Sequence, residues 1–237
     1  PVNPMNRAEE LKHYITDPDT KVAITTGDLA AEWVHASDAL PPAERLAHLV
    51  VTQFTDAFDA NVSGDDAPPP AWADWLGTRH PLPALQQGQA HAWSDAIACA
   101  SEPPKLVVGP QDLALLPYTS GTTGLPKGCM HPHKSIMHNA VASALWGAGS
   151  ADNVTLAVVP MFHITGMVSV MHASIYSAAT IVIMPRWDRD LAGRLISRWQ
   201  VTNWTNIPTM VIDLLASPHF ASYDLSSLVY IGGGGAA

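Results

Sequence analysis

Cysteine and basic residues are scarce in this chain of 237 residues, and each shortage excludes a class of protein. The two cysteines, Cys99 and Cys129, have neither a C-x-x-C nor a metal-site spacing, so the sequence predicts no disulfide framework and no zinc site. Lys and Arg number 12 against 21 Asp and Glu, which gives a formal net charge of −9. Because a nucleic-acid partner needs a basic face, we expect none. Two reduced thiols and the lack of a signal-peptide pattern fit a cytoplasmic protein.

The sequence also lacks an unbroken hydrophobic run of the kind that crosses a membrane. Residues 153–185 contain no Asp, Glu, Lys or Arg and are numerous enough to span a bilayer. Pro160, His163, Gly166 and several serines interrupt this stretch, however. The central strands of an α/β sheet are apolar on both faces, so a buried strand, a buried helix and a second buried strand explain it better. We therefore predict no transmembrane segment.

Hydrophobic residues make up 47% of the chain, and helix-like and strand-like segments alternate along it. This alternation predicts an α/β fold with layered, mostly parallel sheets flanked by helices. Asp188 is expected to cap a helix and Pro208 to open one. A change in composition over residues 102–112 indicates two portions, residues 1–108 and 109–237. The predicted helices cover residues 9–15, 29–35, 72–76, 89–98, 134–146, 166–177 and 188–200 and begin again at 208. The predicted strands cover residues 21–26, 49–51, 113–118, 154–159, 180–184, 202–206 and 225–231.

Residues 118–128, Y-T-S-G-T-T-G-L-P-K-G, combine hydroxyl side chains, glycines and one lysine, a composition that suits polyphosphate binding. Glycines let backbone N–H groups approach an anion, and a lysine adds a mobile positive charge. The Walker motif is excluded because Gly121 is followed five residues later by Pro126 and Lys127 is followed by Gly128. An ordinary surface loop is the alternative interpretation.

This segment resembles the phosphate-loop signature of the adenylate-forming enzyme superfamily, which includes acyl-CoA synthetases, aryl-CoA ligases and luciferases. Two later segments resemble that superfamily in the expected order. Residues 160–166, P-M-F-H-I-T-G, match its Phe-His motif, and residues 230–237, Y-I-G-G-G-G-A-A, match its S-G-G-A segment, with Gly233 where Ser is common. The resemblance covers nearly the whole chain and is closest to fatty-acyl and medium-chain acyl-CoA synthetases. It implies part of the large N-terminal domain of such an enzyme.

The resemblance implies roles for particular residues. His163 is expected to act as a catalytic residue beside the acyl-adenylate, although a lone His in apolar sequence is commonly a core residue. Met167, Val168 and Met171 lie where the acyl tunnel would begin, with core packing as the alternative. His131 and His133 alone do not make a metal site, so no metal site is predicted within the chain. The residues expected to bind the nucleotide are Thr119, Ser120, Gly121, Thr122, Thr123, Gly124 and Lys127 in the loop, and Gly234, Gly235 and Ala236 in the pocket wall.

The resemblance also implies a reaction, in which ATP with Mg²⁺ activates a carboxylic acid, here expected to be a fatty acid, and CoA then takes the acyl group. The Glu for Mg²⁺, the ribose-binding Asp and the catalytic Lys of the superfamily would follow Ala237, so we expect the chain alone to be inactive. A homodimer is possible, because the superfamily is often dimeric. Other adenylate-forming enzymes, such as an aryl-CoA ligase or a luciferase-like enzyme, and a non-catalytic binding module remain alternatives. An amino-acid-activating domain is disfavoured because no Asp lies between Phe162 and Arg186.

Overall fold

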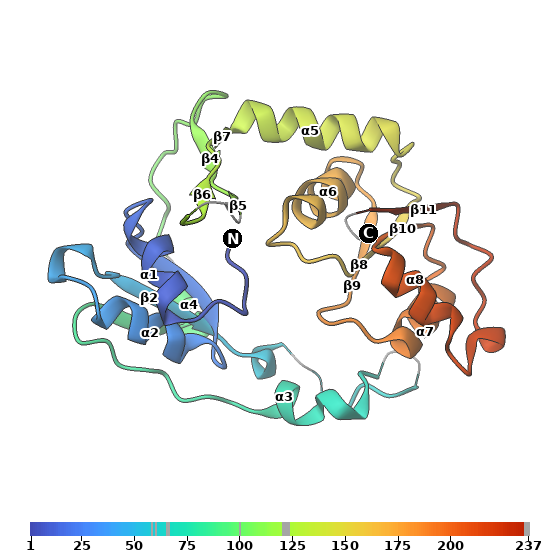
Figure 1. Ribbon diagram of the computed structural model, residues 1–237, viewed down its shortest axis with the longest axis horizontal. Coiled ribbons are helices and arrows are strands. Elements are labelled where there is room, and N and C mark those ends of the chain that lie inside the picture. The colour runs from blue at the N-terminus through green and yellow to red at the C-terminus, as the bar shows by residue number, and fades with distance from the viewer. Residues whose placement is uncertain (58, 60, 65–66, 100, 120–123, 235–237) are drawn as a thin grey trace. The chain divides into compact units, whose positions relative to one another are not determined.

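The computed structural model describes residues 1–57, 59, 61–64, 67–99, 101–119 and 124–234. The chain divides into two compact units (Figure 1). The N-terminal unit comprises Val2–Val62 and Pro68–Leu106, and the C-terminal unit comprises Pro1, Ser63–Ala67 and Val107–Ala237. The domain boundary between residues 108 and 109 stays a prediction, because compactness alone does not show that either portion folds independently.

The N-terminal unit contains a parallel sheet of three strands in the order β1-β2-β3. Leu49 and Val51 alternate along β2 and are buried in one apolar core with Leu11 and Ile15 of α1. The repeat of two residues in a strand and of about four in a helix brings these apolar side chains onto facing surfaces. The strands are β1 (Val22–Thr26), β2 (His48–Thr52) and β3 (Gln89–Ala92). The helices are α1 (Ala8–Thr16), α2 (Ala30–Asp38), α3 (Ala73–Gly77) and α4 (Trp93–Ala98), with 3₁₀ turns at Pro42–Glu44, Phe54–Asp56 and Pro70–Trp72.

Strand β3 corrects the helix predicted over residues 89–98. Only the second part of that segment is helical, as α4. The first part pairs in parallel with β2, with Ala90 opposite Leu49 and Ala92 opposite Val51. Its sequence, Q-A-H-A, contains no β-branched residue and so carries little strand propensity of its own. Hydrogen bonding to a neighbouring strand that is distant in sequence decided the conformation.

The C-terminal unit contains a parallel sheet of four strands in the order β11-β10-β8-β9. The α/β fold with parallel sheets and flanking helices that the sequence predicts is therefore confirmed. The strands are β8 (Val154–Ala157), β9 (Thr180–Ile183), β10 (Asn203–Asn206) and β11 (Tyr230–Gly233). The helices are α5 (His133–Trp146), the π-helix η5 (Thr165–His172), α6 (Ala173–Tyr176), α7 (Arg189–Trp199) and α8 (Pro208–Leu215), with a 3₁₀ turn, η6, at Phe220–Ser222.

The direction of the connections reverses at β8. Strand β9 lies on one side of β8, and β10 lies on the other. Because crossovers between parallel strands are right-handed, the helices η5 and α6 pack on one face of the sheet and α7 on the opposite face. Figure 1 shows α5 and α6 on one side of these strands and α7 and α8 on the other. Trp204 of β10 is buried and stacks on Trp187, which precedes α7, with ring centroids 5.9 Å apart.

Both helix-boundary predictions for this unit are confirmed. The Oδ1 atom of Asp188 accepts a hydrogen bond of 2.8 Å from the backbone N–H of Leu191, which satisfies one of the free amides at the start of α7. Pro208 is the first residue of α8, where the missing N–H removes no helical hydrogen bond. These local signals fix where the two helices begin.

The segment around the glycine-rich loop is an antiparallel hairpin, and not a strand of the main sheet. Strand β4 (Leu113–Leu115) pairs with β7 (His131–Pro132), and β5 (Tyr118–Thr119) pairs with β6 (Lys127–Gly128). The single strand predicted over residues 113–118 is thus divided. Pro117 lies at the break and lacks an N–H, although its carbonyl oxygen accepts a 2.9 Å hydrogen bond from the Cys129 amide.

Two further boundaries differ from the sequence-based expectation. The last strand begins at Tyr230, and not at residue 225. The side chain of Asp224 accepts hydrogen bonds from the backbone N–H and the hydroxyl of Ser226, which forms a turn where a strand was predicted. The helix predicted over residues 166–177 is present, but its first eight residues form a π-helix. Such helices are rare and are often found at functional sites.

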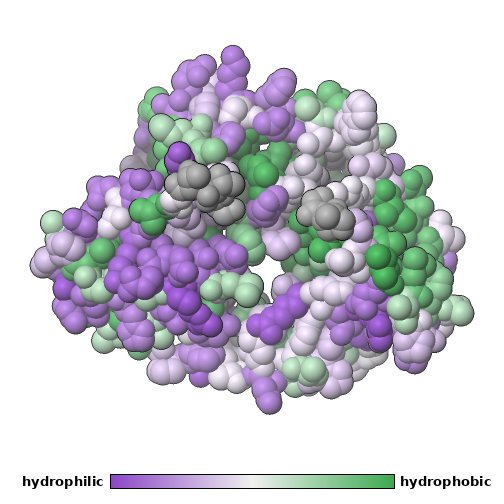
Figure 2. All heavy atoms as spheres, viewed as in Figure 1, coloured by the Kyte–Doolittle hydropathy of each residue, from purple (hydrophilic) through white to green (hydrophobic). Residues whose placement is uncertain are grey.

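Residues 153–185 form β8, η5, α6 and β9, so the predicted order of strand, helix and second strand is confirmed. The predicted burial holds for β8 but not for β9, an edge strand in which Thr180 and Ile183 are exposed. Within the described part of the chain, no helix combines the length and the apolar character that crossing a bilayer requires. Figure 2 shows hydrophobic side chains at the surface of the C-terminal unit on the side where α8 lies. Ile212 and Leu215 of α8 are exposed.

Candidate functional site

The carboxyl ends of the parallel strands in the C-terminal unit meet at one edge of the sheet. The chain adds β9 on one side of β8 and β10 on the other, so the strand order changes direction between β8 and β10. Open α/β sheets bind ligands at such a point, outside the carboxyl ends of the strands. The chain reaches His163 after β8, Ile207 after β10 and Gly234 after β11. Two of the residues predicted from separate motifs, His163 and Gly234, therefore follow strands that end at this same edge.

His163 is exposed at the start of η5 and is not a core histidine. Its Nδ1 atom lies 3.3 Å from the backbone N–H of Thr165 and accepts a hydrogen bond from it. In a neutral ring this assigns the proton to Nε2, which leaves an N–H donor directed away from the helix backbone. The positive end of the helix dipole lies at the same place. The arrangement can stabilise a carboxylate or phosphate oxygen, and the catalytic role of His163 stays a prediction.

Gly166 allows η5 to begin close to the end of β8. A Cβ atom at this position would overlap the carbonyl oxygens of Pro160 and Val159. Because both obstacles are backbone atoms, no change of rotamer removes the overlap. The glycine of the Phe-His motif is therefore required by packing, and it fixes the path of the chain through His163.

The glycine-rich loop is carried on the paired strands β5 and β6. Thr119 lies directly opposite Lys127 in this antiparallel pair, so their side chains project from the same face. Both side chains are exposed, which places a hydroxyl and an ammonium group together at the base of the loop. Gly124 has a φ of +137°, a conformation that residues with a side chain rarely adopt. The predicted phosphate contacts of Ser120, Gly121, Thr122 and Thr123 lie outside the described residues.

An apolar cluster joins the hairpin to the helix that follows His163. Ile136 of α5 and Met167 and Val168 of η5 are buried together, and Leu115 of β4 and Met171 pack against them. Met167 and Val168 are only 5% exposed. Of the two interpretations open for these residues, core packing therefore describes Met167 and Val168. Their packing holds the hairpin and η5 against α5.

Other side chains of the same helix line a cavity of about 410 Å³ between α5, the helices η5 and α6, and the sheet. Ser169, Ala173 and Ser177, spaced four residues apart, are the helix residues that sequence reasoning missed. Their small size and helical spacing are the signal that could have found them. The remaining lining residues are Asn139, Ala142, Ser143, Ala144, Trp146, Gly147, Asn153, Thr155, Ser174, Ala179, Asn203, Thr205 and Tyr230.

The glycines at the end of β11 leave space beside the sheet because they have no side chain. Gly233 pairs with Asn206, and a Cβ on this glycine would lie 2.8 Å from Asn206 Oδ1. Asn206 is buried, and its Nδ2 donates a 3.2 Å hydrogen bond to the carbonyl oxygen of Trp204. Among the described residues, no atom lies within 4 Å of the position of a Cβ on Gly234. Gly235 and Ala236 lie outside the described residues.

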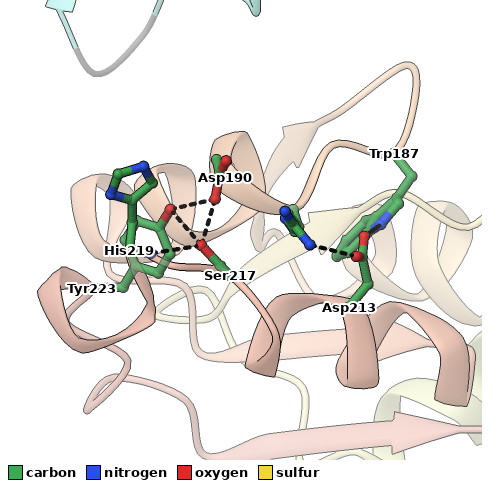
Figure 3. Close-up of polar contacts among 7 residues, drawn as sticks. Trp187, Asp190, Asp213, Ser217, His219 and Tyr223 are labelled. Carbon is green, nitrogen blue, oxygen red and sulfur yellow. Dashed lines mark hydrogen bonds and ion pairs between the residues drawn. The ribbon is translucent and has the colours of Figure 1, made fainter.

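A second polar cluster, shown in Figure 3, connects α7 to the turn after α8. Ser217 Oγ donates a 2.5 Å hydrogen bond to Asp190 Oδ1, and the Tyr223 hydroxyl donates a 2.9 Å bond to the same oxygen. The bond from Ser217, followed by that from Tyr223, lowers the pKa of Asp190, whereas burial raises the pKa of Tyr223. The ring of Tyr223 occupies the place of a Cβ on Gly193. These hydrogen bonds join α7 to the turn that follows α8.

The described residues contain no group of three or more His, Cys, Asp or Glu side chains that could hold a metal ion. His131 is engaged locally, with its Nδ1 3.3 Å from Ser135 Oγ. The hairpin, in contrast, has the donors that a nucleotide phosphate needs, in the opposed side chains of Thr119 and Lys127.

The sequence profile described as AMP-binding enzyme matches residues 1–237. The chain is 36% identical over 152 residues to 4-coumarate–CoA ligase 2 of Oryza sativa subsp. japonica, an alignment that covers 61% of this chain and 26% of that enzyme. The ATP-bound crystal structure of MatB from Rhodopseudomonas palustris aligns with 100% of this chain at 22% identity and a TM-score of 0.69. A fatty acyl CoA synthetase of Mycobacterium tuberculosis aligns with 100% of the chain at 22% identity and a TM-score of 0.70.

The chain spans 39% of each of these two solved structures. At this level of identity the two structures show a shared fold. The superfamily predicted from the motifs is confirmed by the profile match, and the predicted fold is confirmed by both structures.

Proposed function

The chain belongs to the AMP-binding enzyme family, and we propose that the protein containing it activates a carboxylic acid with ATP and transfers the acyl group to CoA. In the first step a carboxylate oxygen attacks the α-phosphorus of ATP, which forms an acyl-adenylate and releases pyrophosphate. In the second step the CoA sulfur attacks the acyl carbon, and AMP leaves with the electrons of the broken C–O bond. The observation that carries this proposal is the pairing of Thr119 with Lys127 at the base of a glycine-rich hairpin.

Positioning and charge neutralisation provide most of the catalysis in such a displacement at phosphorus. We assign Lys127 to the β- or γ-phosphate of ATP, with Thr119 and the loop hydroxyls as hydrogen-bond donors. Mg²⁺, the expected cofactor, would be held largely by the phosphates themselves, which is its usual mode of binding. The paired strands β5 and β6 flank the loop on both sides.

We assign His163 and the open backbone at Gly234 to the acyl-adenylate. The Nε2–H of His163 can donate to the carboxylate or to the adenylate phosphate, and the N-terminus of η5 favours the same negative charge. The open surface at Gly234 admits a flat group, such as adenine or an acyl chain, against the end of β11. Both positions follow strands whose carboxyl ends lie at the same edge of the sheet.

A fatty acid is the first candidate for the acid, on the resemblance of the motifs to fatty-acyl and medium-chain acyl-CoA synthetases. An aromatic acid is the second candidate, and the observation that favours it is the 36% identity to an enzyme that acts on 4-coumarate. A cytoplasmic location is also proposed, because Cys99 and Cys129 are both unpaired and exposed, as is usual where thiols stay reduced. We also propose a homodimer, for which the only support is the resemblance of the motifs to the adenylate-forming superfamily.

The proposal is tested with protein expressed from the complete open reading frame and a panel of carboxylic acids. ATP–pyrophosphate exchange measures the first step, and CoA thioester formation measures the second. Lys127→Ala is expected to lower kcat/KM for exchange by about a hundredfold, the effect of removing one preorganised charge contact. The control is Lys134→Ala, which removes an exposed lysine from the first turn of α5 and should leave the rate unchanged. Equal activity of Lys127→Ala and the control would contradict the assignment, and no exchange with any acid would contradict the function.

A further inference from the structure

The carboxyl end of β10 is joined to the sheet on one side. Strand β10 pairs with β8 through Asn203 and Trp204, whereas its pairing with β11 continues to Asn206, which lies opposite Gly233. Among the described residues, no partner in β8 lies opposite Asn206. The carboxyl ends of β8 and β10 are therefore unpaired at the point where the strand order changes direction and where open α/β sheets bind ligands. Contacts between β10 and β11 thus determine how the end of β10 borders this edge.

Asn206 carries a polar side chain that is buried at this end of β10. It is only 5% exposed and lies on the same face of the sheet as Trp204, two residues earlier. Its Nδ2 donates a 3.2 Å hydrogen bond to the Trp204 carbonyl oxygen, whereas its Oδ1 accepts none from the part of the chain that the structure describes. Asn is depleted in strands, and burial of a polar atom without a partner costs free energy. The fold alone therefore favours an apolar residue at this position.

The Oδ1 atom of Asn206 lies against Gly233. A Cβ on Gly233 would lie 2.8 Å from this Oδ1 and 3.0 Å from the backbone carbonyl oxygen of Asn206. Side chains of directly paired residues project from the same face, so the Asn206 amide fills the space that a side chain at residue 233 would need. The hydrogen bond to the Trp204 carbonyl holds the amide in that place. The two residues are therefore complementary in volume.

Tyr230 covers the opposite face of the same glycine segment. It lines the cavity on the α5 side of the sheet, and a Cβ on Gly232 would overlap its hydroxyl. A tyrosine ring can change rotamer, so this contact can yield. At Gly233 one of the two obstacles is a backbone oxygen, which can move only with β10 itself. The contact with Asn206 is therefore the stricter of the two, and it fixes the path of β11 into Gly234.

A change in this contact would displace the backbone of Gly234. Ordinary van der Waals contact begins at 3.4 Å, so a Cβ at 2.8 Å requires a movement of about 0.6 Å. A displacement of about 1 Å at a reacting group lowers a rate about a hundredfold. We propose, on the basis of the carboxylate-activating function above, that Asn206 is a positioning residue of the acyl-adenylate site. Its amide fills the space over Gly233 and so places Gly234 against the adenylate.

An exchange of volume between the two strands tests this inference in protein expressed from the complete open reading frame. Gly233→Ala overfills the contact, Asn206→Ala empties it, and the double variant moves the side chain from β10 to β11. With the best acid of the panel, each single variant is expected to lower kcat/KM for ATP–pyrophosphate exchange about tenfold. The double variant should recover to within about threefold of the unmodified protein, because residues in contact are coupled.

A binding measurement separates positioning from stability. An acyl-sulfamoyl adenosine with the same acyl group is a stable analogue of the acyl-adenylate, and its affinity is measured by calorimetry on the same samples. Loss of stability alone reduces the number of folded molecules and leaves the affinity of each one unchanged. A positioning role predicts about tenfold weaker binding in each single variant and recovery of affinity in the double variant.

Two matched controls should leave both measurements unchanged. Gly109→Ala places a Cβ at an ordinary 3.6 Å from Asp112 Oδ2. Asn139→Ala removes an exposed amide of α5 that also donates to a backbone carbonyl, that of Ser135, at 3.1 Å. If Asn206→Ala does not fold, Asn206→Ser with and without Gly233→Ala gives the same comparison. Additive losses in the double variant, or unchanged affinity for the analogue in the single variants, overturn the role of Asn206 but leave the carboxylate-activating function intact. No exchange by the unmodified protein with any acid overturns that function itself.

Discussion

Replacing Gly166 by alanine tests whether packing at the start of η5 positions His163. The added Cβ would overlap two backbone carbonyl oxygens, those of Val159 and Pro160, so the helix must move relative to the end of β8. Overpacking of this kind destabilises a protein by about 1–3 kcal/mol. Alanine gains about 1 kcal/mol over glycine in helix propensity, which offsets part of that loss. The expected net change in the free energy of unfolding is therefore small, about 0–2 kcal/mol.

The effect on activity is expected to be larger than the effect on stability. Backbone hydrogen bonds join His163 to both sides of this contact, since its N–H donates to Pro160 and its carbonyl oxygen accepts from Met167. A shift of the helix therefore moves the His163 ring. Misplacing a reacting group by about 1 Å lowers a rate about a hundredfold. We expect Gly166→Ala to lower kcat for adenylation by about that factor.

The assay combines ATP–pyrophosphate exchange with thermal unfolding of the same protein samples. Gly77→Ala is the matched control, because Gly77 also belongs to a helix and a Cβ there would meet no atom within 4 Å. The control should retain full activity and equal or slightly higher stability. If Gly166→Ala behaved like Gly77→Ala in both measurements, the claim that backbone contact fixes the position of His163 would be wrong.

Two further predictions concern α7 and its first turn, and a third concerns the whole chain. Asp188→Ala should lower the free energy of unfolding by about 1 kcal/mol through loss of the cap on Leu191, as measured by denaturant unfolding, whereas Asp188→Asn should retain most of it. The hydrogen bond from Ser217 lowers the pKa of Asp190 in the folded state, so its contribution to stability is present above about pH 4 and is lost as the pH falls through that lowered pKa. Asp190→Asn should consequently show a shallower loss of stability in acid titrations, and an identical acid profile would refute the role. The purified 237-residue chain should not catalyse ATP–pyrophosphate exchange, and robust exchange would show that the expected downstream residues are unnecessary.

Local signals in the sequence were sufficient to predict many of the helices and strands. Asp188 and Pro208 each specify a helix start through atoms of their own residue, so their structural roles could be predicted without knowledge of distant contacts. Segments 89–92 and 113–119 were predicted less well. Their conformations depend on pairing with β2 and with residues 127–132, which lie far along the chain or across a loop.

Part of the candidate site could likewise be predicted from the sequence, and part could not. Its motif residues, such as Lys127 and His163, could be chosen because phosphate and carboxylate chemistry requires particular side chains at short spacing. Asn206 and Ser169 could not be chosen, because neither belongs to a motif that marks its chemistry. The pairing of β10 with β11 and the packing of η5 against α5 decide what surrounds these two residues, and neither can be read from local sequence.

The sequence by itself determined the composition of the glycine-rich loop, the alternation of strands and helices over residues 154–215, and membership of the AMP-binding enzyme family. Only the tertiary structure decided which face of the helix after His163 is core and which lines a cavity. A helix carries Met167 and Ser169 on different faces whatever surrounds it, and packing against α5 determines which face is buried. That packing buried Met167 in an apolar cluster and left Ser169 on the face that lines the cavity.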